Sequence, residues 1–217
     1  MGIALFDLDN TLIAGDSDYL WGCFLAENGM VDGAAYERRN RRFYDQYLAG
    51  ELNIHEFLDF QLGPLAAHDM PTLQRLREQY ITEKILPILL PKAQQLIDNH
   101  RQQNHLPVII TATNRFITSP IARLYGIDHL LATEPEISNN RYTGKVAGTP
   151  CFREGKVDNL AGWLQEHAET LTDSWFYSDS HNDLPLLNKV THPVAVDPDE
   201  ILRRHALEQG WNIVSLR

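Results

Sequence analysis

The sequence predicts an α/β fold: a Rossmann-like, three-layer parallel sheet core with an all-helical cap inserted between the first and second core strands. Short apolar runs alternate with helical patterns over most of the chain, which is typical of a parallel sheet covered on both faces. The stretch 15–86 instead carries helix signals and few strand signals. A length of 217 residues suits one domain with an insert. We therefore expect a catalytic core over 1–14 and 87–217 and a cap over 15–86.

The core elements follow from periodicity and from their flanking residues. Apolar runs of strand length predict buried strands at Ile3–Leu8, Pro107–Thr111, Trp175–Tyr177, Val194–Val196 and Trp211–Val214. Apolar residues at helical spacing predict helices from Pro91 to about His100, about Ser119 to Tyr125, Val157 to Trp163, and Asp199 to Glu208. A small hairpin is expected at Arg141–Lys145. Ligands of parallel sheets bind at the carboxyl ends of the strands, so a site is expected there.

The cap should contain four helices, because four polar residues stand where a helix would begin. These capping residues are Asp16 or Ser17, Asp32, Asn53 with Glu56, and Asp69 with Pro71. An insert after the first strand would lie over the carboxyl edge of the sheet. We expect it to cover the site as a lid.

Composition excludes several classes of protein. A net charge of −10 argues against nucleic acid or an anionic membrane surface as the main partner. No run approaches the 18 apolar residues of a membrane helix, and Ile3–Phe6 begins without the basic region of a secretory leader. Cys23 and Cys151 lack metal-ligand spacing. We expect a cytoplasmic protein, monomer or homodimer, whose partner is a small molecule.

Two carboxylates at the end of the first predicted strand carry the chemical signal. Asp7 and Asp9 are two residues apart, so in an extended strand both side chains face one site. At about 4 Å their repulsion is roughly 4 kcal/mol at an effective dielectric near 20. Helix capping by Asp9 or Asn10 would explain one acid but not both. A bound cation is the expected compensation.

A second acidic pair, Asp179 and Asp183, follows the predicted strand Trp175–Tyr177. Asp183 precedes Leu184 and Pro185 and has a helix cap as its alternative role. Carboxylates gathered with water and phosphate oxygens are the ligands that Mg²⁺ prefers. The sequence therefore predicts a Mg²⁺ site rather than a zinc site.

Thr111 and Lys156 add the features of an anion site. Thr111 ends a predicted strand, where its hydroxyl and the following amides can hold an anion, and Lys156 follows Gly155 at a helix start. Each alone has an ordinary structural explanation. Gly155-Lys156 is not a P-loop, because the required glycine and hydroxyl residue are missing.

These motifs in this order resemble the haloacid dehalogenase superfamily of phosphohydrolases, over the chain from Asp7 to Asp183. The helical insert is similar to the cap of its phosphoserine phosphatase-like branch, subfamily IB. Within that branch, three segments resemble bacterial members assigned as histidinol-phosphate phosphatases: Phe6–Leu12, Ala14–Asp18 and Thr111–Phe116.

The resemblance implies a role for each matching residue. Asp7 would attack phosphorus and form an aspartyl-phosphate, and Asp9 would act as general acid and then general base. Mg²⁺ would be held by Asp7, the Asp9 carbonyl and Asp179, while Asp183 would hold metal-bound water. The phosphoryl group would be bound by Asp7, Thr111, Ala112, Lys156 and Asn182. Contacts from the cap to the leaving group are expected from Asp16, Asp18, Tyr19 and Trp21.

Departures from the phosphoserine phosphatase pattern indicate the substrate. Asp59-Phe60-Gln61 stands where a cap arginine would bind a carboxylate, and Asp16 stands where a cap glutamate would meet an amine. The stretch 15–86 has seven basic and twelve acidic residues. These features favour a small amino-alcohol phosphate such as histidinol phosphate. Phosphoserine, or a broad range of small phosphate esters, is the alternative. The basic cluster Arg38–Arg42 would suit a more acidic substrate, but its spread around a helix favours a solvated, ion-paired surface.

Two classes other than a phosphatase are also compatible with parts of the pattern. A signalling receiver has a phosphate-accepting aspartate, but it lacks the helical insert and an acid at the position of Asp9. A catalytically silent phosphate-binding scaffold could share the fold, since fold alone does not fix function. The complete set Asp7, Asp9, Lys156 and Asp179 favours an enzyme.

Overall fold

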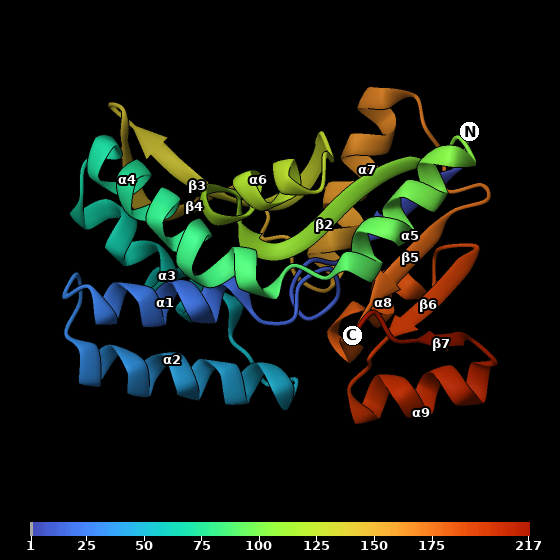
Figure 1. Cartoon of the computed structure of the whole chain (residues 1–217), viewed down its shortest axis with the longest axis horizontal. Helices are drawn as coiled ribbons and strands as arrows, with labels where there is room; N and C mark the ends of the chain where they lie inside the picture. The colour runs from blue at the N-terminus through green and yellow to red at the C-terminus, as the bar shows by residue number, and fades with distance from the viewer. Residues whose placement is uncertain (1) are drawn as a thin grey trace.

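The computed structural model describes residues 2–217, which form an α/β fold around one sheet (Figure 1). The sheet order is β4-β3-β2-β1-β5-β6-β7. Neighbouring strands are parallel except for β3 and β4, which are antiparallel. The strands are β1 (Ile3–Phe6), β2 (Leu106–Asn114), β3 (His129–Ser138), β4 (Arg141–Ala147), β5 (Trp175–Ser178), β6 (His192–Val196) and β7 (Asn212–Val214). The predicted fold class is confirmed.

Helices cover both faces of this sheet. In β1, Ala4 and Phe6 belong to one apolar cluster and Ile3 and Leu5 to another, because successive side chains of a strand point to opposite faces. The first cluster includes α5 (Pro91–Gln102) and α6 (Arg115–Leu124). The second includes α7 (Glu154–His167), α8 (Leu184–Leu187) and α9 (Glu200–Gln209). Burying each large side chain contributes roughly 1.5–3 kcal/mol, so β1 is fixed from both sides.

Of the α-helices between β1 and β2 in the chain, the first four gather at one end of the molecule, beside β3 and β4, and we call them the cap helices (Figure 1). They are α1 (Ser17–Glu27), α2 (Gly33–Leu48), α3 (Ile54–Ala67) and α4 (Met70–Tyr80). Their first turns are capped as the sequence predicts, since a side-chain oxygen accepts from a first-turn amide at Asp16, Asp32, Asn53 and Asp69. No helix within residues 2–217 combines the length and apolar character needed to cross a bilayer.

The two chain segments that join the cap to the core run side by side. Ile13 and Leu89 form an isolated antiparallel bridge, and the amide of Ala14 donates to the Ile88 carbonyl at 2.8 Å. The Tyr125 hydroxyl donates to the carbonyl of Leu12 in one segment and accepts from the amide of Leu90 in the other, at 3.2 Å for the latter. These contacts anchor the cap at this edge. Before the second segment, α4 continues through a π-helical turn, 81–85, and a 3₁₀ turn, 86–88.

Strand β3 differs most from the sequence prediction, which contained no strand at its position. Its first half pairs with β2, but beyond Thr133 it pairs with β4 instead. The second half contains Pro135 between two glutamates, and a proline inside an apolar run argues against a central strand. The hairpin is therefore longer than predicted. Its turn lies at Asn139 and Asn140, both with positive φ, and not within 141–145.

Helix α6 begins four residues earlier than expected. Asn114 caps it by accepting from the Ile117 amide at 3.3 Å, so Pro120 lies inside the helix and not at its start. A proline has no N–H for the carbonyl four residues back. Arg77 of the cap takes this carbonyl, at Phe116, with a hydrogen bond of 2.8 Å. The irregularity thus becomes a contact between cap and core.

Candidate active site

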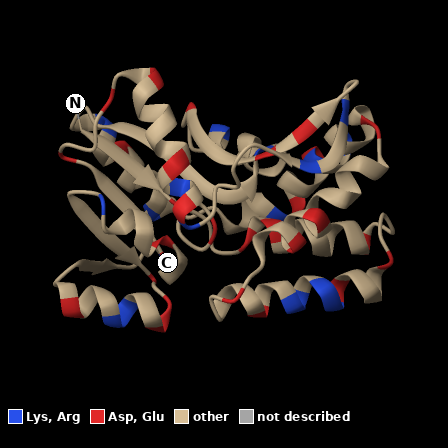
Figure 2. Cartoon of the chain, turned by 180° about the vertical axis from the view of Figure 1, so that it is seen from behind, with Lys and Arg blue, Asp and Glu red and all other residues tan. Residues whose placement is uncertain are grey.

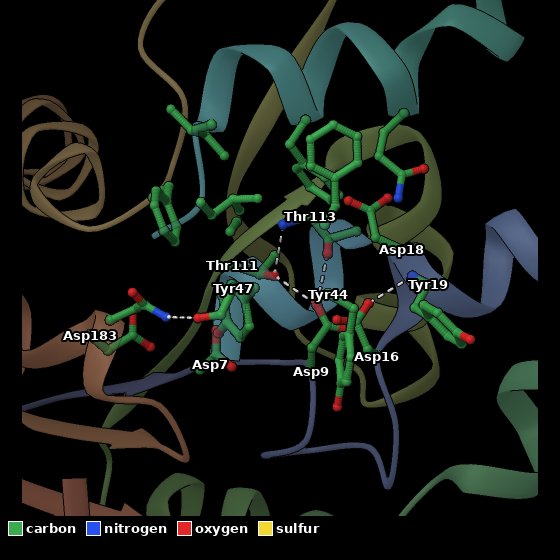
Figure 3. A pocket seen from close by; sticks show the side chains of 18 of the residues that line it. Asp7, Asp9, Asp16, Asp18, Tyr19, Tyr44, Tyr47, Thr111, Thr113 and Asp183 are labelled. Carbon is green, nitrogen blue, oxygen red and sulfur yellow. Dashed lines mark hydrogen bonds between the residues drawn. The ribbon is translucent and has the colours of Figure 1, made fainter. Parts of the chain in front are cut away.

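The carboxyl ends of β1 and β2 and the start of α7 face the cap helices across one cavity (Figure 3). Its core end contains Asp7, Asp9, Thr111, Lys156 and Asp183. These residues are far apart in the sequence. The parallel topology brings them together because strand ends meet at one edge of the sheet.

Lys156 is the centre of the core end. Its ammonium group donates to an Asp7 carboxylate oxygen at 2.7 Å and to Asp183 at 2.8 Å, and all three side chains are at least nine-tenths buried. Ser178 adds a hydrogen bond of 2.6 Å to Asp183. A buried charge needs both a counter-charge and hydrogen bonds. Lys156 has both, so it holds Asp7 in one orientation.

The core end contains more carboxylates than the single lysine can neutralise. Burial raises the pKa of Asp7 to about 7 against the lowering effect of Lys156, and the charges of Asp183 and Asp9 add to the rise. Burial also raises the pKa of Asp179, with further contributions from Asp7 and Asp183. For Lys156, burial lowers the pKa, but Asp183 and Asp7 outweigh this and the pKa rises. Negative charge is therefore concentrated here beyond what one lysine offsets.

This excess of carboxylates fits a hard divalent cation. Asp179 lies against the first strand's loop, where the Thr11 hydroxyl donates to it at 3.3 Å and accepts from its amide at 3.1 Å. Across residues 2–217, no three His, Cys, Asp or Glu side chains converge as a metal-binding group. Mg²⁺ does not require such a group, because one or two carboxylates with a carbonyl and water suffice. Asp7, Asp179 and the Asp9 carbonyl are the residues that would hold it.

Asp9 is held on the other side of the cavity floor. One carboxylate oxygen accepts from the Thr113 hydroxyl at 2.8 Å and from the Thr111 hydroxyl at 3.4 Å (Figure 3). The other accepts from the amide of Ser17 at 2.6 Å. Ser17 is the first residue of α1, so the amino end of a cap helix orients Asp9. The contact links the position of the cap to the position of this acid.

The cap end of the cavity is aromatic and acidic. Its apolar wall comprises Tyr19, Phe43, Tyr44, Tyr47, Leu52, Ile54, Phe57 and Phe152. Asp16 and Asp18 lie beyond Asp9, and the amides of Asn40 and Gln61 complete the lining. Burial, followed by the charge of Asp9, raises the pKa of Asp16 to about 7. Asp18 has one hydrogen-bonding neighbour, the Asn114 amide group at 3.2 Å.

The structure brings most of the predicted residues to this cavity. Ala112, Asn182 and Tyr19 line it together with the acids. Trp21 does not: it is fully buried among Phe24, Tyr80 and Phe116, on the face of α1 away from the cavity lining. The prediction was wrong for Trp21 because neighbouring positions of α1 meet different surroundings: Asp18 lines the cavity, whereas the Trp21 ring packs into the aromatic core.

Sequence reasoning also missed several residues. Thr113 was not assigned a role, although its hydroxyl makes the shorter of the two threonine contacts with Asp9. Of the aromatic wall, only Tyr19 was predicted as a substrate contact. Arg153, at the start of α7, was not considered. The sequence did contain a signal for Thr113: it is a polar residue two positions after Thr111, and alternate residues of a strand share a face.

The arginine cluster of α2 does not line the cavity. Arg38, Arg39, Arg41 and Arg42 are exposed, and they appear in blue on the outer cap helix in Figure 2. Arg41 pairs with Asp45 at 3.1 Å, and Arg39 lies over the Phe60 ring at 4.6 Å. Exposed pairs of this kind contribute at most about 1 kcal/mol. The cluster is a solvated helix face.

A family model supplies the decisive comparison. The model of the haloacid dehalogenase-like hydrolases matches residues 4–188, which include every residue of the core end described above. The chain belongs to this family. The resemblance seen in the sequence is thereby confirmed, and the chain is a phosphatase of the haloacid dehalogenase-like group.

Relatives of known name agree with this membership. The haloacid dehalogenase-like chain is 42% identical to a protein of Neisseria meningitidis serogroup C named histidinol-phosphatase, covering 99% of both chains. It is also 29% identical to the Mycobacterium tuberculosis protein named phosphoserine phosphatase SerB1, covering 99% of this chain and 70% of the relative.

Solved structures agree as well. A Bordetella pertussis protein described as having unknown function superimposes with a TM-score of 0.94 at 44% identity, covering 99% of this chain and 98% of that one. A phosphoserine phosphatase solved as a phospho-aspartyl intermediate analogue gives a TM-score of 0.72 at 18% identity, covering 100% and 93%. The latter likeness shows the shared fold.

Proposed function

We propose that this protein is a Mg²⁺-dependent phosphatase that acts through an aspartyl-phosphate on a small amino-alcohol phosphate, with L-histidinol phosphate as the substrate. One observation carries the proposal. A single cavity has a lysine-held aspartate at its core end and two acids within an aromatic wall at its cap end. The relative named histidinol-phosphatase, at 42% identity over almost the whole chain, supports the choice of substrate.

In the first step, an oxygen of Asp7 attacks phosphorus, and the bond between phosphorus and the ester oxygen breaks. Lys156 holds Asp7 in place and would face the phosphoryl oxygens, as would the hydroxyl of Thr111. Asn182 lines the same cavity, but its side-chain amide nitrogen already donates to the Tyr47 carbonyl and the Ser180 hydroxyl. Asp9 donates a proton to the leaving alcohol, so histidinol departs neutral at this oxygen. The products of this step are a free alcohol and a phosphorylated Asp7.

In the second step, water attacks the phosphorus of the aspartyl-phosphate, and Asp9 accepts the proton of that water. The bond to Asp7 breaks, inorganic phosphate forms and Asp7 is restored. The hydrogen bonds from Ser17 and Thr113 keep Asp9 in reach of both the alcohol and the water. Bound Mg²⁺ would supply positive charge that offsets the repulsion between the Asp7 carboxylate and the phosphate dianion.

The cap end suits a leaving group that is cationic and flat. An ammonium group is favoured by the charges of Asp16 and Asp18, and an imidazole ring packs well against aromatic side chains. Asn40 and Gln61 offer amide groups for the ring nitrogens.

Cys23 and Cys151 are free thiols, which supports action in the reducing cytoplasm.

Phosphoserine is the second candidate, because the SerB1 relative is named for it. Its carboxylate would need a cation at the cap end. Among the described residues that line the cavity, the only cation is Lys156, which already faces Asp7 and Asp183. The family pattern places a carboxylate-binding arginine on α3, but the α3 residue Gln61, which lines the cavity here, is neutral. The cavity thus favours a substrate without a carboxylate.

The test is phosphate release by the purified protein from histidinol phosphate, phosphoserine and glycerol phosphate, with Mg²⁺ and with EDTA. We expect the highest kcat/KM for histidinol phosphate and loss of turnover with EDTA. Preference for phosphoserine would overturn the substrate assignment. Full activity in EDTA would contradict the metal requirement, and no release from any ester would favour a silent binding protein.

A further inference from the structure

Arg153 stands at the amino end of α7 with backbone angles that an L-residue rarely adopts. Its φ is 50° and its ψ is −119°, in a region normally occupied by glycine. The same loop is tight, because a Cβ at Gly155 would come within 2.0 Å of the Pro150 carbonyl oxygen. An arginine in a conformation that favours glycine indicates that its side chain has a specific task.

The side chain of Arg153 links the core to the cap. Its Nε donates to the side-chain oxygen of Asn182 at 3.0 Å, and a terminal nitrogen donates to the carbonyl of Gly50. The guanidinium also lies over the ring of Phe152, 5.1 Å from its centre. Gly50 follows α2, so the cation meets the carbonyl end of a helix, where positive charge is favoured.

Asn182 makes a second link to the same helix end. Its amide nitrogen donates to the carbonyl of Tyr47 at 3.2 Å, while its oxygen accepts from Arg153. The next residue, Asp183, is the partner of Lys156. One loop therefore holds both the end of α2 and a member of the core cluster.

The end of α2 has no space to approach the core more closely. Gly50 has φ +72°, and a Cβ there would lie 2.8 Å from Nε2 of His181. Tyr47 and Phe152 face each other across this junction with ring centres 6.2 Å apart, and both line the cavity. The junction thus forms one wall of the cavity, distant in sequence from the two linkers that anchor the cap.

We propose that Arg153 is a positioning residue that fastens the end of α2 onto the core and so keeps the cap closed over a substrate that fills the cap end. It acts on Asn182 and on the Gly50 carbonyl, not on phosphorus. Without the guanidinium, both oxygens lose their donor and the helix end separates more readily from the core. This inference rests on the proposed phosphatase function.

The test compares Arg153→Gln with Arg101→Gln by two readouts. Arg101 is a matched control, because it also donates to backbone carbonyls, those of Tyr125 and Gly126, at 2.9 and 2.5 Å, and its ion pair at 2.8 Å is with Asp98 of α5. The first readout is hydrogen exchange of a peptide spanning 46–53. We expect exchange there to rise at least about fivefold in Arg153→Gln and to stay unchanged in Arg101→Gln, and inorganic phosphate should not restore it.

The second readout is kcat/KM for histidinol phosphate against p-nitrophenyl phosphate, which carries no amine for the cap acids. Arg153→Gln should lower kcat/KM for histidinol phosphate about tenfold or more, mainly through KM, and should lower kcat/KM for p-nitrophenyl phosphate less than about threefold. Arg153→Lys should partly restore the value for histidinol phosphate. Equal loss on both substrates, or unchanged exchange at 46–53, would overturn the proposal. If the wild-type protein releases no phosphate from any ester, the proposed function fails, and hydrogen exchange alone still decides whether Arg153 fastens the cap.

Discussion

The two ends of the cavity are built differently. At the core end, Lys156 bonds to two carboxylates and Asp9 accepts from three donors. At the cap end, Asp18 has a single hydrogen bond and the neighbouring wall is apolar. Groups with several partners are fixed before a substrate arrives, which is what phosphoryl transfer requires.

At the cap end, Asp16 accepts from the Tyr19 amide and Asp18 from Asn114, so these acids have fewer partners than the core acids. We therefore propose that the chemistry takes place at the core end and that the cap end selects the leaving group. Changes at the core should affect every substrate, while changes at the cap should affect only substrates with a matching group. The predictions below test this division.

The largest effect is expected from Asp7→Asn. The amide is nearly isosteric but is a poor nucleophile, so kcat should fall by about 10⁴-fold or more on every phosphate ester. Phosphate release measures the loss, and a thermal melt checks the fold. Asp98→Asn, at a half-exposed position of α5 outside the cavity lining, is the control and should leave kcat unchanged. An Asp7→Asn enzyme that retains turnover would remove Asp7 from the nucleophilic role.

Lys156→Met should cause the largest loss of stability. It leaves Asp7 and Asp183 buried without their shared cation, a change that costs about 3–5 kcal/mol. Urea denaturation measures this. The control is Lys145→Met, which breaks an exposed 2.8 Å pair with Asp59 and should cost less than about 1 kcal/mol. Equal losses in the two variants would show that the core pair is not held as described.

Asp16→Asn tests the cap end. Asparagine keeps the capping oxygen of α1 but removes the charge. We expect kcat/KM for histidinol phosphate to fall about tenfold, equivalent to roughly 1.4 kcal/mol, with little change for glycerol phosphate, whose leaving group carries no charge. Asp32→Asn caps α2 in the same way on an exposed surface and serves as control. A uniform loss on both substrates would assign Asp16 to the core chemistry instead.

A further prediction concerns His100, which lies away from both ends of the cavity. Burial, with the neighbouring His105, lowers its pKa from 6.5 to about 4, and its ring contacts the Tyr177 hydroxyl at 2.8 Å. Between these pH values the unfolded chain binds more protons, so stability should fall as pH drops from 6.5 towards 4. Melts of His100→Gln should show a flatter pH dependence; an unchanged slope would assign the acid sensitivity to other groups.

Much of the core end was predictable from sequence, because parallel strands bring their carboxyl ends together. Asp7, Asp9 and Thr111 could be placed near one another on that basis, whereas Lys156, at a helix start, was placed there through the family resemblance. The capping residues of the cap helices were predicted from polar residues at the helix starts. The start of α6 at Asn114 was not predicted, because Pro120 suggested a helix that begins near Ser119, and the contact of Arg77 with the Phe116 carbonyl comes from a residue distant in sequence.

The cap wall was much less predictable. Helical periodicity shows which residues share a face, but it does not show whether that face meets another helix or a cavity. Trp21 and Tyr19 lie two residues apart on α1, yet only Tyr19 reaches the cavity. Arg153 was missed because positive φ has no sequence signal when the residue is not glycine. Its role follows from the folded structure, in which it donates to the carbonyl of Gly50, 103 residues earlier in the sequence.

The backbone at Arg153 also permits a comparison of stability. Arg153→Gly and Arg153→Ala both remove the guanidinium, but only alanine keeps the strain of positive φ. The glycine variant should be more stable than the alanine variant by about 1 kcal/mol. Thermal melts measure the difference. An alanine variant at least as stable as glycine would argue against strain at this position.

The most direct measurement is acid quenching of the wild-type protein during turnover of histidinol phosphate with Mg²⁺, followed by mass spectrometry of its peptides. The account predicts one added phosphoryl group on the peptide containing Asp7, and none in Asp7→Asn. Phosphate release by the wild-type protein with no phosphorylated Asp7 at any quench time, or a phosphoryl group on a different residue, would contradict it.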